Sequence, residues 1–511
     1  MTSGLHHVTL ITRRVQDNVD FYAGFLGLRL VKQTAGFEDA RQLHLFYGDG
    51  AGAPGSLVSF LVWEDGARGR VGHGQVAEIA LAIPKAAIGD WLTRALARQI
   101  PVEGPLRAFG ETVLRLRDPD GVVVKLVGSD VGPEVPWQDA PARLHSVTIW
   151  SADAPATAAF LTRFGYRPGP VEGTVRRWLS ERDAIDIRDV AGFVAGVAGT
   201  GIADHVALRV PEAAALDRHE ADLAGAGFGP VTVHDRRYFR SLYVREPAGT
   251  LIELATDGPG MTVDETLETL GGRLMVPPHD TAEAGDLALL LPQFARPGEE
   301  RIPMRDLPFI HRFHRPEDPD GSVILTLHGT GGDETDLMPL ARHLAPRATI
   351  LGVRGRSTEE GINRWFRRLE MTRFDQADIR AEADAFGAFL DGAVAGYGLE
   401  PDRITALGYS NGANFAAALM GLHPGTIRRA ILLRAMPALE DLPDVDLAGT
   451  AVLSLSGARD PYGVHAPRLD AWLRAQGADL TAETLPAGHE ISGADLTRAK
   501  AWLDRVAPDA T

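Results

Sequence analysis

Hydrophobic and polar residues between positions 201 and 254 follow a pattern that predicts one small folding unit. Alternation with a period of two predicts a first strand at 204–210 and further strands that end at 250–254. Between them, apolar residues at helical spacing predict a helix at 212–225. The predicted order is β-α-β-β-β, a unit of roughly fifty residues that buries too little apolar surface to be stable alone. We therefore expect further copies in the chain.

The same pattern occurs four times. The ending "REPAGTLIEL" at 245–254 returns as "RDPDGVVVKL" at 117–126 and, more loosely, as "GAPGSLVSFL" at 52–61. The opening strand "DHVALRV" has counterparts in "LHHVTLI", "VAEIALAIP" and "LHSVTIW". Four consecutive βαβββ modules, an α+β fold, are therefore predicted at 1–62, 75–128, 143–190 and 201–256.

The pattern changes after Asp320, where short apolar strands alternate with helices such as those expected at 377–397 and 411–422. This alternation predicts an α/β fold with a largely parallel sheet that is covered on both faces. The strands are expected at 323–327, 349–353, 404–409, 430–433 and 451–455.

A proline-rich segment separates the two patterns. Residues 277–319 contain eight prolines and few long apolar periods, which is typical of a connection between domains. A short helix is expected at 284–291, and His311 and His314 are expected on an edge strand. The expected domains are 1–135 for modules one and two, 142–275 for modules three and four, 276–304 for the linker and 305–511 for the α/β domain.

Composition narrows the classes of function. The 511 residues imply about three domains, and 45% hydrophobic with 23% charged residues is ordinary for a globular protein. A formal net charge of −16 without a basic run argues against a nucleic-acid partner. The absence of cysteine excludes disulfides, iron–sulfur clusters and a thiolate nucleophile. No signal peptide or membrane span is recognised, so we expect a soluble, cytoplasmic protein without a membrane partner.

The first part of the chain resembles the vicinal oxygen chelate superfamily. The segments "LHHVTLITRRVQDNVDFYAGFLGLRLVKQT", "LHLFYGD" and "GAPGSLVSF" look like its ring-cleaving dioxygenases that act on hydroquinones, and the resemblance covers residues 1–294. In that superfamily, paired βαβββ modules curl their sheets into cups that hold a metal. The resemblance implies His7, His205 and Glu253 as the metal ligands, with an aromatic substrate and dioxygen as the reactants.

Aligning the repeats with one another tests this ligand set. The alignment places Ser146, Glu78 and Lys125 at the positions of the three ligands. A hydroxyl, a carboxylate and an ammonium cannot hold a divalent metal together, so only one cup is expected to bind metal. The second cup is expected to be structural, with Glu78 and Lys125 paired. In the metal-binding cup, the fourth equivalent position is Ser59.

Two neutral imidazoles and one carboxylate leave about three coordination positions open, as in non-haem Fe(II) oxygenases. Mn(II) suits the same donors and stays an alternative. By resemblance, Arg236, Tyr243 and His6 match positions near the substrate or the metal, where they could orient a phenolate or supply a proton. Asp204 departs from the hydroquinone enzymes, in which a second His commonly precedes the ligand, so the substrate stays open.

In the α/β region, the motif Gly-Tyr-Ser-Asn-Gly at 408–412 comes directly after a predicted strand and before a predicted helix. Small residues on either side of Ser410 permit the sharp elbow that exposes a nucleophilic hydroxyl. Asp460 and His489 follow later strands, in the chain order that α/β-hydrolases use. His489 would accept the proton of Ser410, and Asp460 would fix the imidazole tautomer.

The glycine-rich segment "LHGTGGDETDL" supplies the remaining element. Backbone N–H groups of Thr330 and Asn411 are expected to form the oxyanion hole. Together with "GYSNGAN", this segment resembles the carboxylesterase/phospholipase branch of α/β-hydrolases over residues 305–506. Trp365 and Phe366 could line the acyl pocket or could belong to the core.

These observations predict a bifunctional enzyme. Fe(II)-dependent extradiol-type cleavage of a hydroquinone- or catechol-like ring would be followed by serine-dependent hydrolysis of the ring-opened product. One alternative is a glyoxalase-type isomerase fused to a thioesterase, although Ser59 at the fourth position argues against it. Another is an aromatic-binding module fused to a carboxylesterase. The sequence leaves the oligomeric state open, and a homo-oligomer is compatible with it.

Overall fold

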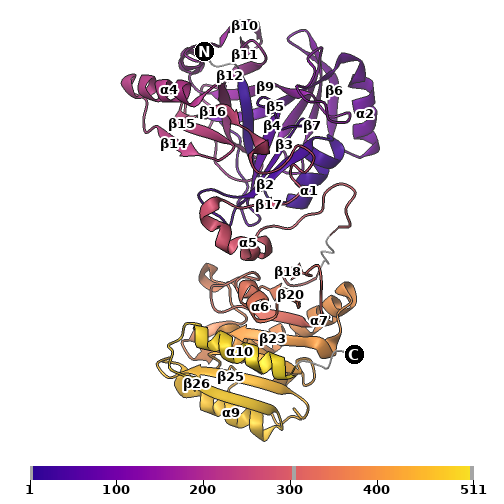
Figure 1. The fold of residues 1–511 in the computed structure, drawn as a ribbon, viewed down its shortest axis with the longest axis vertical. Coiled ribbons are helices and arrows are strands. Elements are labelled where there is room, and N and C mark those ends of the chain that lie inside the picture. The colour runs from indigo at the N-terminus through magenta and orange to yellow at the C-terminus, as the bar shows by residue number, and fades with distance from the viewer. Residues whose placement is uncertain (1–3, 302–306, 507–511) are drawn as a thin grey trace. The chain divides into compact units, whose positions relative to one another are not determined.

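The computed structural model describes residues 4–301 and 307–506 of the chain (Figure 1). Two compact units are present. Unit 1 comprises the described residues up to Leu287 and from Leu291 to residue 301, and unit 2 comprises Ala288–Leu290 and the described residues from 307 onward. The expected boundary at residues 304 and 305 lies outside the described residues, and the other expected domain limits stay predictions.

Unit 1 contains a nine-stranded sheet that combines the first and the fourth module. Its strand order is β14-β15-β16-β13-β1-β4-β3-β2-β17, and β1 pairs antiparallel with β13 at its centre. Module one therefore completes its sheet with a module that lies roughly 200 residues further along the chain. The strands are β1 (Leu5–Thr12), β2 (Arg29–Ala35), β3 (Leu43–Gly48), β4 (Leu57–Val62), β13 (Ala203–Val210), β14 (Thr232–Asp235), β15 (Phe239–Arg245), β16 (Leu251–Pro259) and β17 (Leu274–Met275).

An eight-stranded sheet combines the second and the third module in the same way. Its order is β10-β11-β12-β9-β5-β8-β7-β6, with β5 and β9 antiparallel at the centre. The prediction of four βαβββ modules is confirmed by these two sheets. The strands are β5 (Gln75–Pro84), β6 (Val102–Ala108), β7 (Glu111–Arg117), β8 (Val123–Ser129), β9 (Arg143–Ser151), β10 (Arg167–Glu172), β11 (Val175–Leu179) and β12 (Ala184–Asp189).

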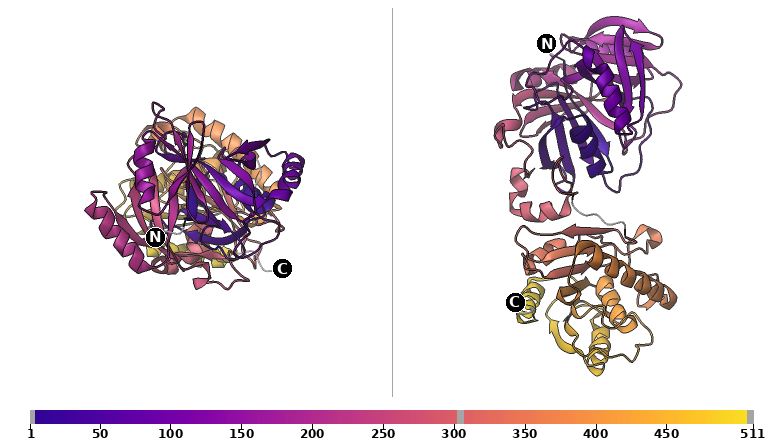
Figure 2. Two further views of the ribbon diagram at one scale, coloured as in Figure 1. Left: turned by 90° about the horizontal axis from the view of Figure 1, so that it is seen from above. Right: turned by 90° about the vertical axis from the view of Figure 1, so that its right-hand side faces the viewer.

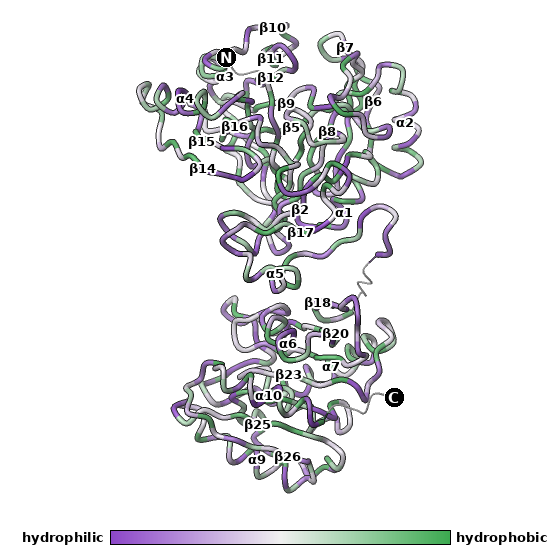
Figure 3. Tube along the Cα trace, viewed as in Figure 1, coloured by the Kyte–Doolittle hydropathy of each residue, from purple (hydrophilic) through white to green (hydrophobic). Residues whose placement is uncertain are grey.

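Alternation along the central strands decides which side chains face the core. On β1, Leu5, Val8 and Leu10 join the main core of unit 1, whereas His7 and Thr9 face the opposite side. Figure 3 shows the corresponding green, hydrophobic stretches along the strands. The same core includes apolar residues of the module helices α1 (Val15–Val19), α2 (Ile88–Ala97), α3 (Ala154–Thr162) and α4 (Ala213–Gly225). A π-helical turn, Asp20–Phe25, extends α1, so that the helical segment covers the helix that the sequence predicts near 16–24.

Strand register confirms the alignment of the repeats. In the first sheet, Glu253 lies opposite Ala207, two residues beyond His205 on the parallel neighbour. In the second sheet, Lys125 lies opposite Ala80, two residues beyond Glu78. Equivalent positions in sequence therefore occupy equivalent positions in the two sheets.

Unit 2 is an α/β fold, as predicted. Its seven-stranded sheet has the order β18-β20-β19-β23-β24-β25-β26, and all neighbours are parallel except the edge strand β18, which carries His311 and His314 as expected. The strands are β18 (His311–His314), β19 (Val323–Leu327), β20 (Thr349–Val353), β23 (Ile404–Tyr409), β24 (Arg429–Leu433), β25 (Ala451–Gly457) and β26 (Asp479–Leu485), and β21 (Arg368–Glu370) with β22 (Arg373–Phe374) forms a separate two-stranded ribbon.

Helices cover both faces of this sheet, as the right-hand view of Figure 2 shows. One face packs against α7 (Gln376–Tyr397), α8 (Asn411–Leu422) and α9 (Ala466–Ala475), and the other packs against α6 (Met338–Leu344) and α10 (Gly493–Val506). The short helix expected at 284–291 is present as α5 (Ala284–Leu290), and its last three residues belong to unit 2. Among the residues that the structure describes, no helix combines the length and the hydrophobicity that crossing a bilayer requires. Short 3₁₀ turns lie at Lys85–Ala87, Met261–Val263, Pro278–Glu283, Glu359–Gly361, Pro401–Arg403 and Gly463–His465.

Candidate active sites

Three buried side chains converge at the centre of the nine-stranded sheet. The Nε2 atom of His7 lies 3.3 Å from Nε2 of His205, and Oε2 of Glu253 lies 3.2 Å from the first and 2.8 Å from the second. These are the three ligands that the sequence implied, brought together from β1, β13 and β16. Strand pairing across the centre of the sheet accounts for their meeting, since Thr9 lies opposite His205.

Each imidazole is held by a hydrogen bond at its other nitrogen. Nδ1 of His205 lies 2.7 Å from the carboxylate of Asp204, and Nδ1 of His7 lies 2.9 Å from Nδ1 of His6. A proton on Nδ1 of both ligands leaves a lone pair on each Nε2. Ser241 donates a hydrogen bond to Oε1 of Glu253, which directs Oε2 toward the imidazoles. Asp204, which the sequence marked only as a departure from the family, therefore orients a ligand.

Protonation at this cluster follows from burial and charge. Burial lowers the pKa of His7 and keeps its imidazole neutral. Burial also opposes a charge on His205, but the interactions with Asp204 and Glu253 outweigh it and raise the pKa of His205 to about 9. Burial opposes ionisation of Glu253 too, yet the two imidazoles hold the pKa of this carboxyl well below its ordinary value. A cation that binds here displaces a proton from His205.

The arrangement fits a divalent transition metal. Neighbouring ligands of an octahedral ion with bonds of about 2.1 Å lie about 3.0 Å apart, and the three donor atoms are separated by 2.8, 3.2 and 3.3 Å. Oε2 of Glu253 is buried and faces the Nε2 atoms of the two imidazoles. One carboxylate with two imidazoles on a single face of an ion is the ligand set of non-haem metal oxygenases.

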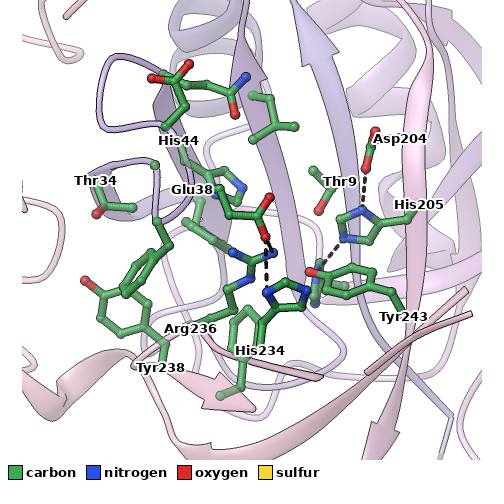
Figure 4. Close-up of a pocket in the computed structure, with 18 of the residues that line it drawn as sticks. Thr9, Thr34, Glu38, His44, Asp204, His205, His234, Arg236, Tyr238 and Tyr243 are labelled. Carbon is green, nitrogen blue, oxygen red and sulfur yellow. Dashed lines mark hydrogen bonds and ion pairs between the residues drawn. The ribbon is translucent and has the colours of Figure 1, made fainter. Parts of the chain in front are cut away.

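A cavity of about 490 Å³ is lined in part by His7 and His205, and Figure 4 shows residues of its wall. Arg236 and Tyr243, predicted from the resemblance, line it, and the Arg236 guanidinium lies over the Tyr243 ring. His6 is buried behind His7 and is not among the lining residues. Figure 4 shows Glu38 beside His234 and Arg236, with distances of 3.2 and 2.9 Å to them. Further lining residues include Thr9, Phe37, His44, Phe46, Asp204, Tyr238 and Phe239.

Sequence reasoning missed Glu38, His44 and His234 as cavity residues. A signal was available for two of them, because His44 shares a face of β3 with Phe46, and His234 is two residues from Arg236 on the chain. Glu38 lies in a loop, where no periodicity indicates direction.

Ser59 occupies the fourth equivalent position in the cup that contains His7, His205 and Glu253, and it adds no charged side chain there. Ser59 lies opposite Thr9 on the parallel strand β4, and its hydroxyl contacts the hydroxyl of Thr9 at 2.8 Å and Nε2 of His44 at 3.1 Å. Among the described residues, the group that could hold a metal consists of His7, His205 and Glu253.

The second cup contains ion pairs at the equivalent positions. Nζ of Lys125 lies 3.0 Å from Oε2 of Glu78 and 3.1 Å from the Thr148 hydroxyl, and Arg115 binds the other carboxylate oxygen of Glu78 at 3.0 Å. The predicted pairing of Glu78 with Lys125 is confirmed. Burial opposes ionisation of Glu78, but Lys125 and Arg115 outweigh it and lower the pKa of this carboxyl.

Lys125→Ala should lower the midpoint of thermal unfolding and leave the metal content of the protein unchanged. Removing Lys125 leaves the largely buried carboxylate of Glu78 with Arg115 as its remaining partner. We expect the free energy of unfolding to fall by about 1–3 kcal/mol. Differential scanning calorimetry and metal analysis check both statements. Lys85→Ala is the matched control, since its pair with Asp130 is exposed and should contribute little. A fall in metal content without loss of stability would make the second cup functional.

In unit 2, hydrogen bonds connect Ser410 to His489 and His489 to Asp460, the three residues that the sequence predicted for this site. Nε2 of His489 lies 3.0 Å from Oγ of Ser410, and Nδ1 of His489 lies 2.9 Å from Oδ2 of Asp460. Asp460 is buried and also accepts a hydrogen bond from the Tyr462 N–H. The arrangement matches the geometry of a nucleophile, a general base and an orienting carboxylate.

Ser410 occupies the strained elbow expected between β23 and α8. Its φ of 49° and ψ of −112° lie outside the favoured regions, so neighbouring packing must hold it there. The flanking glycines are required, because a Cβ at Gly412 would lie 2.1 Å from the Leu327 carbonyl oxygen and one at Gly408 would lie 2.7 Å from Ala413. Close packing of strand and helix thus presents the hydroxyl at the sheet edge.

A cavity of about 270 Å³ adjoins Ser410, and Thr330, Asn411 and His489 line it as predicted for oxyanion donors and base. Trp365 and Phe366 do not line it. Both are fully buried in the core of unit 2, where Trp365 stacks on Phe415. Of the two readings that the sequence left open, the core reading is confirmed.

The chain is similar to known proteins of two kinds, ring-cleaving dioxygenases and hydrolases. Residues 4–126 match the family model "Glyoxalase/Bleomycin resistance protein/Dioxygenase superfamily". The chain is 35% identical over 298 residues to "Putative ring-cleaving dioxygenase MhqO" of Bacillus subtilis, covering 55% of this chain and 94% of that protein. It is 30% identical to "Chlorohydroquinone/hydroquinone 1,2-dioxygenase" of Sphingobium indicum, covering 54% and 92%. It is also 35% identical over 183 residues to "Putative hydrolase MhqD" of Bacillus subtilis, covering 35% and 92%.

Proposed function

We propose that this chain, which belongs to the glyoxalase/bleomycin resistance protein/dioxygenase superfamily, cleaves a dihydroxylated aromatic ring with dioxygen and then hydrolyses the ring-opened product. The observation that carries the first step is the convergence of His7, His205 and Glu253 beside an aromatic-lined cavity. The name of the Sphingobium relative supports a hydroquinone as the substrate. The second step rests on Ser410 and its hydrogen-bonded partners.

Fe(II) is the metal that we propose for the three ligands, because a set of two imidazoles and one carboxylate with open positions is typical of Fe(II) oxygenases. When bound, Fe(II) would supply the redox chemistry that joins dioxygen to an electron-rich ring. Mn(II) binds the same kinds of donor atom, and reconstitution with each metal distinguishes it from Fe(II). Asp204 and His6 hold the ligand imidazoles in orientation through their hydrogen bonds to Nδ1.

The cavity residues bind and orient the ring. Phe37, Phe46 and Phe239 offer apolar faces to an aromatic substrate. Burial raises the pKa of the Tyr243 hydroxyl, so this group stays protonated and can donate a hydrogen bond to a phenolate oxygen. Burial also lowers the pKa of His44 well below its ordinary value, which keeps its imidazole neutral. A neutral imidazole can accept a hydrogen bond from the substrate hydroxyl.

Hydrolysis follows from the geometry at Ser410. Oγ attacks the carbonyl carbon of the product while its proton passes to Nε2 of His489. The N–H groups of Thr330 and Asn411 stabilise the oxyanion. His489 returns the proton to the leaving group, and a water molecule then repeats the sequence on the acyl-enzyme, with Asp460 stabilising the imidazolium throughout.

Anaerobic reconstitution with Fe(II), followed by oxygen-electrode assays, tests the proposal. Hydroquinones should drive oxygen uptake with one dioxygen consumed per ring, whereas the metal-free protein should consume none. Reconstitution with Mn(II) is the parallel arm. Stoichiometric metal binding without oxygen uptake on any hydroquinone or catechol would reject the dioxygenase and favour an isomerase or a binding module.

A further inference from the structure

The cavity beside Ser410 is positively charged. Three arginines line it, Arg364, Arg368 and Arg434, and no lining residue is acidic. Its volume of about 270 Å³ suits a small acyl group of a few carbons. Nothing in the hydrolysis of a neutral ester requires these cations, because the oxyanion hole and His489 carry that chemistry.

The positive charge of Arg434 is paired with a carboxylate of the protein. Arg434 is buried and forms a bidentate pair with Asp495, at 2.7 and 2.8 Å. Arg434 also donates to the carbonyl oxygens of Leu455, Gly488 and Glu490. This guanidinium is therefore structural. Arg368 is half-buried and lies at the cavity wall.

Arg364 is different. Its side chain is 3% exposed, and its Nε and Nη1 atoms are buried without a hydrogen-bond partner among the described residues. Burying guanidinium N–H groups without hydrogen-bond acceptors costs free energy, because these groups lose their hydrogen bonds to water. Arginine also keeps its positive charge at ordinary pH, so it cannot lower this cost by losing a proton. A folded protein tolerates such a group where a ligand supplies the missing partner.

The backbone holds this guanidinium in place. The Arg364 N–H donates to the Ser357 carbonyl at 2.7 Å, and the Ser357 N–H returns a bond to the Arg364 carbonyl at 3.1 Å. The next residue, Trp365, donates its N–H to Oδ1 of Asn411 at 2.8 Å and its indole N–H to the His328 carbonyl at 2.9 Å. Arg364 is thus connected, through the adjacent Trp365, to Asn411, the residue that follows the nucleophile.

We propose that Arg364 binds a carboxylate on the acyl part of the substrate, so that the serine hydrolase is specific for acyl compounds that carry a second, anionic carboxylate. Guanidinium N–H groups match carboxylate oxygens in geometry and charge. Arg368 adds positive potential at the same wall and favours entry of the anion. The inference rests on the proposed role of Ser410.

The proposed ring cleavage supplies this carboxylate. When dioxygen is inserted between a hydroxylated ring carbon and its neighbour, one oxygen atom joins each carbon and the bond between them breaks. The hydroxylated carbon becomes a carboxylic acid, and its neighbour becomes a carbonyl. Every ring-opened product of this type is therefore an anion at neutral pH, the ligand class that Arg364 requires.

Two methyl esters of matched shape test the specificity in the full-length protein. Monomethyl succinate carries a carboxylate where methyl 4-methylpentanoate carries an uncharged branched end. Wild type should favour the anionic ester in kcat/KM. Arg364→Met should lower kcat/KM for the anionic ester about 10- to 100-fold, the range expected for charged hydrogen bonds, and should change the neutral ester less than about threefold. Arg364→Lys should recover part of the preference, and Arg373→Met, an exposed arginine of the same segment, should alter neither ester.

A second measurement separates a binding role from a structural one. Succinate should raise the unfolding temperature of wild type and not that of Arg364→Met, and in buffer alone the variant should be as stable as wild type or more so. An unchanged ester preference together with an unchanged succinate response would overturn the inference. A variant that unfolds earlier in buffer would do the same, because it assigns Arg364 to the structure. If Ser410→Ala hydrolysed the neutral ester as fast as wild type, the proposed hydrolase itself would fail, and succinate binding would still decide the role of Arg364.

Discussion

His7→Ala is expected to lose stoichiometric metal and oxygen uptake while it continues to hydrolyse a neutral ester at the rate of wild type. The imidazole of His7 is one of the three donors that we propose for the metal, and its Nε2 lies within 3.3 Å of both other donor atoms. Loss of a residue that merely orients a ligand costs about 10- to 100-fold in metal affinity, so loss of a ligand should cost more than that. Metal analysis after gel filtration and the oxygen electrode measure the two effects.

The variant needs a control within the same cavity. His44 is also a cavity histidine, but its Nε2 contacts the Ser59 hydroxyl at 3.1 Å and it does not belong to the ligand cluster. His44→Ala should therefore retain its metal, whatever happens to turnover. If His7→Ala bound metal at one equivalent and consumed oxygen normally, the ligand assignment would be wrong.

Ser410→Ala should consume oxygen at the rate of wild type and accumulate a ring-opened compound. Cleavage of a 1,4-dihydroxylated ring leaves an enol that can ketonise, which places two carbonyls in a 1,3 relation. The carbon–carbon bond between them is open to attack by an activated serine, because the departing carbanion is a stabilised enolate, and an acyl or lactone form suits the same residues. Without Oγ of Ser410, the nucleophile that contacts His489 is absent. Mass spectrometry of the reaction mixture identifies the accumulated species.

The two variants can complement one another. His7→Ala retains the hydrolase, so adding it to a reaction of Ser410→Ala should consume the accumulated compound. Transfer through solution should be slower than turnover by wild type, since a tethered second site encounters the product at a higher effective concentration. Identical products and rates from Ser410→Ala and wild type would show that the hydrolase serves another substrate.

Positions set by strand periodicity and repeat symmetry were predictable from the sequence. The period of two places His7 and Thr9 on one face of β1, and the repeat places Glu253 two residues beyond the partner of His205. The elbow at Ser410 was predictable because its flanking glycines are required sterically. Both cases depend on local geometry that a few residues determine.

Features that depend on burial or on loops were not predictable. Arg364 lies in a segment with several arginines, and the letters alone do not show which guanidinium is enclosed without a partner. Trp365 and Phe366 could equally line a pocket until the packing of Phe415 against them is known. His6 was expected beside a metal ligand, and its Nδ1 lies 2.9 Å from Nδ1 of His7. Its absence from the cavity lining was not predictable, because the strand pairing is irregular between Leu5 and His7.

Because the first module pairs with the fourth, the metal centre is among the last parts of unit 1 that a growing chain can complete. His7 and His205 are 198 residues apart, whereas Glu78 and Thr148 at the centre of the other sheet are 70 apart. The shorter loop closes at lower entropic cost and can close earlier in synthesis. Until β13 emerges, the outer edge of β1 has no partner strand and is exposed to wrong pairing. A metal ion can therefore meet all three proposed donors only after residue 253 has left the ribosome.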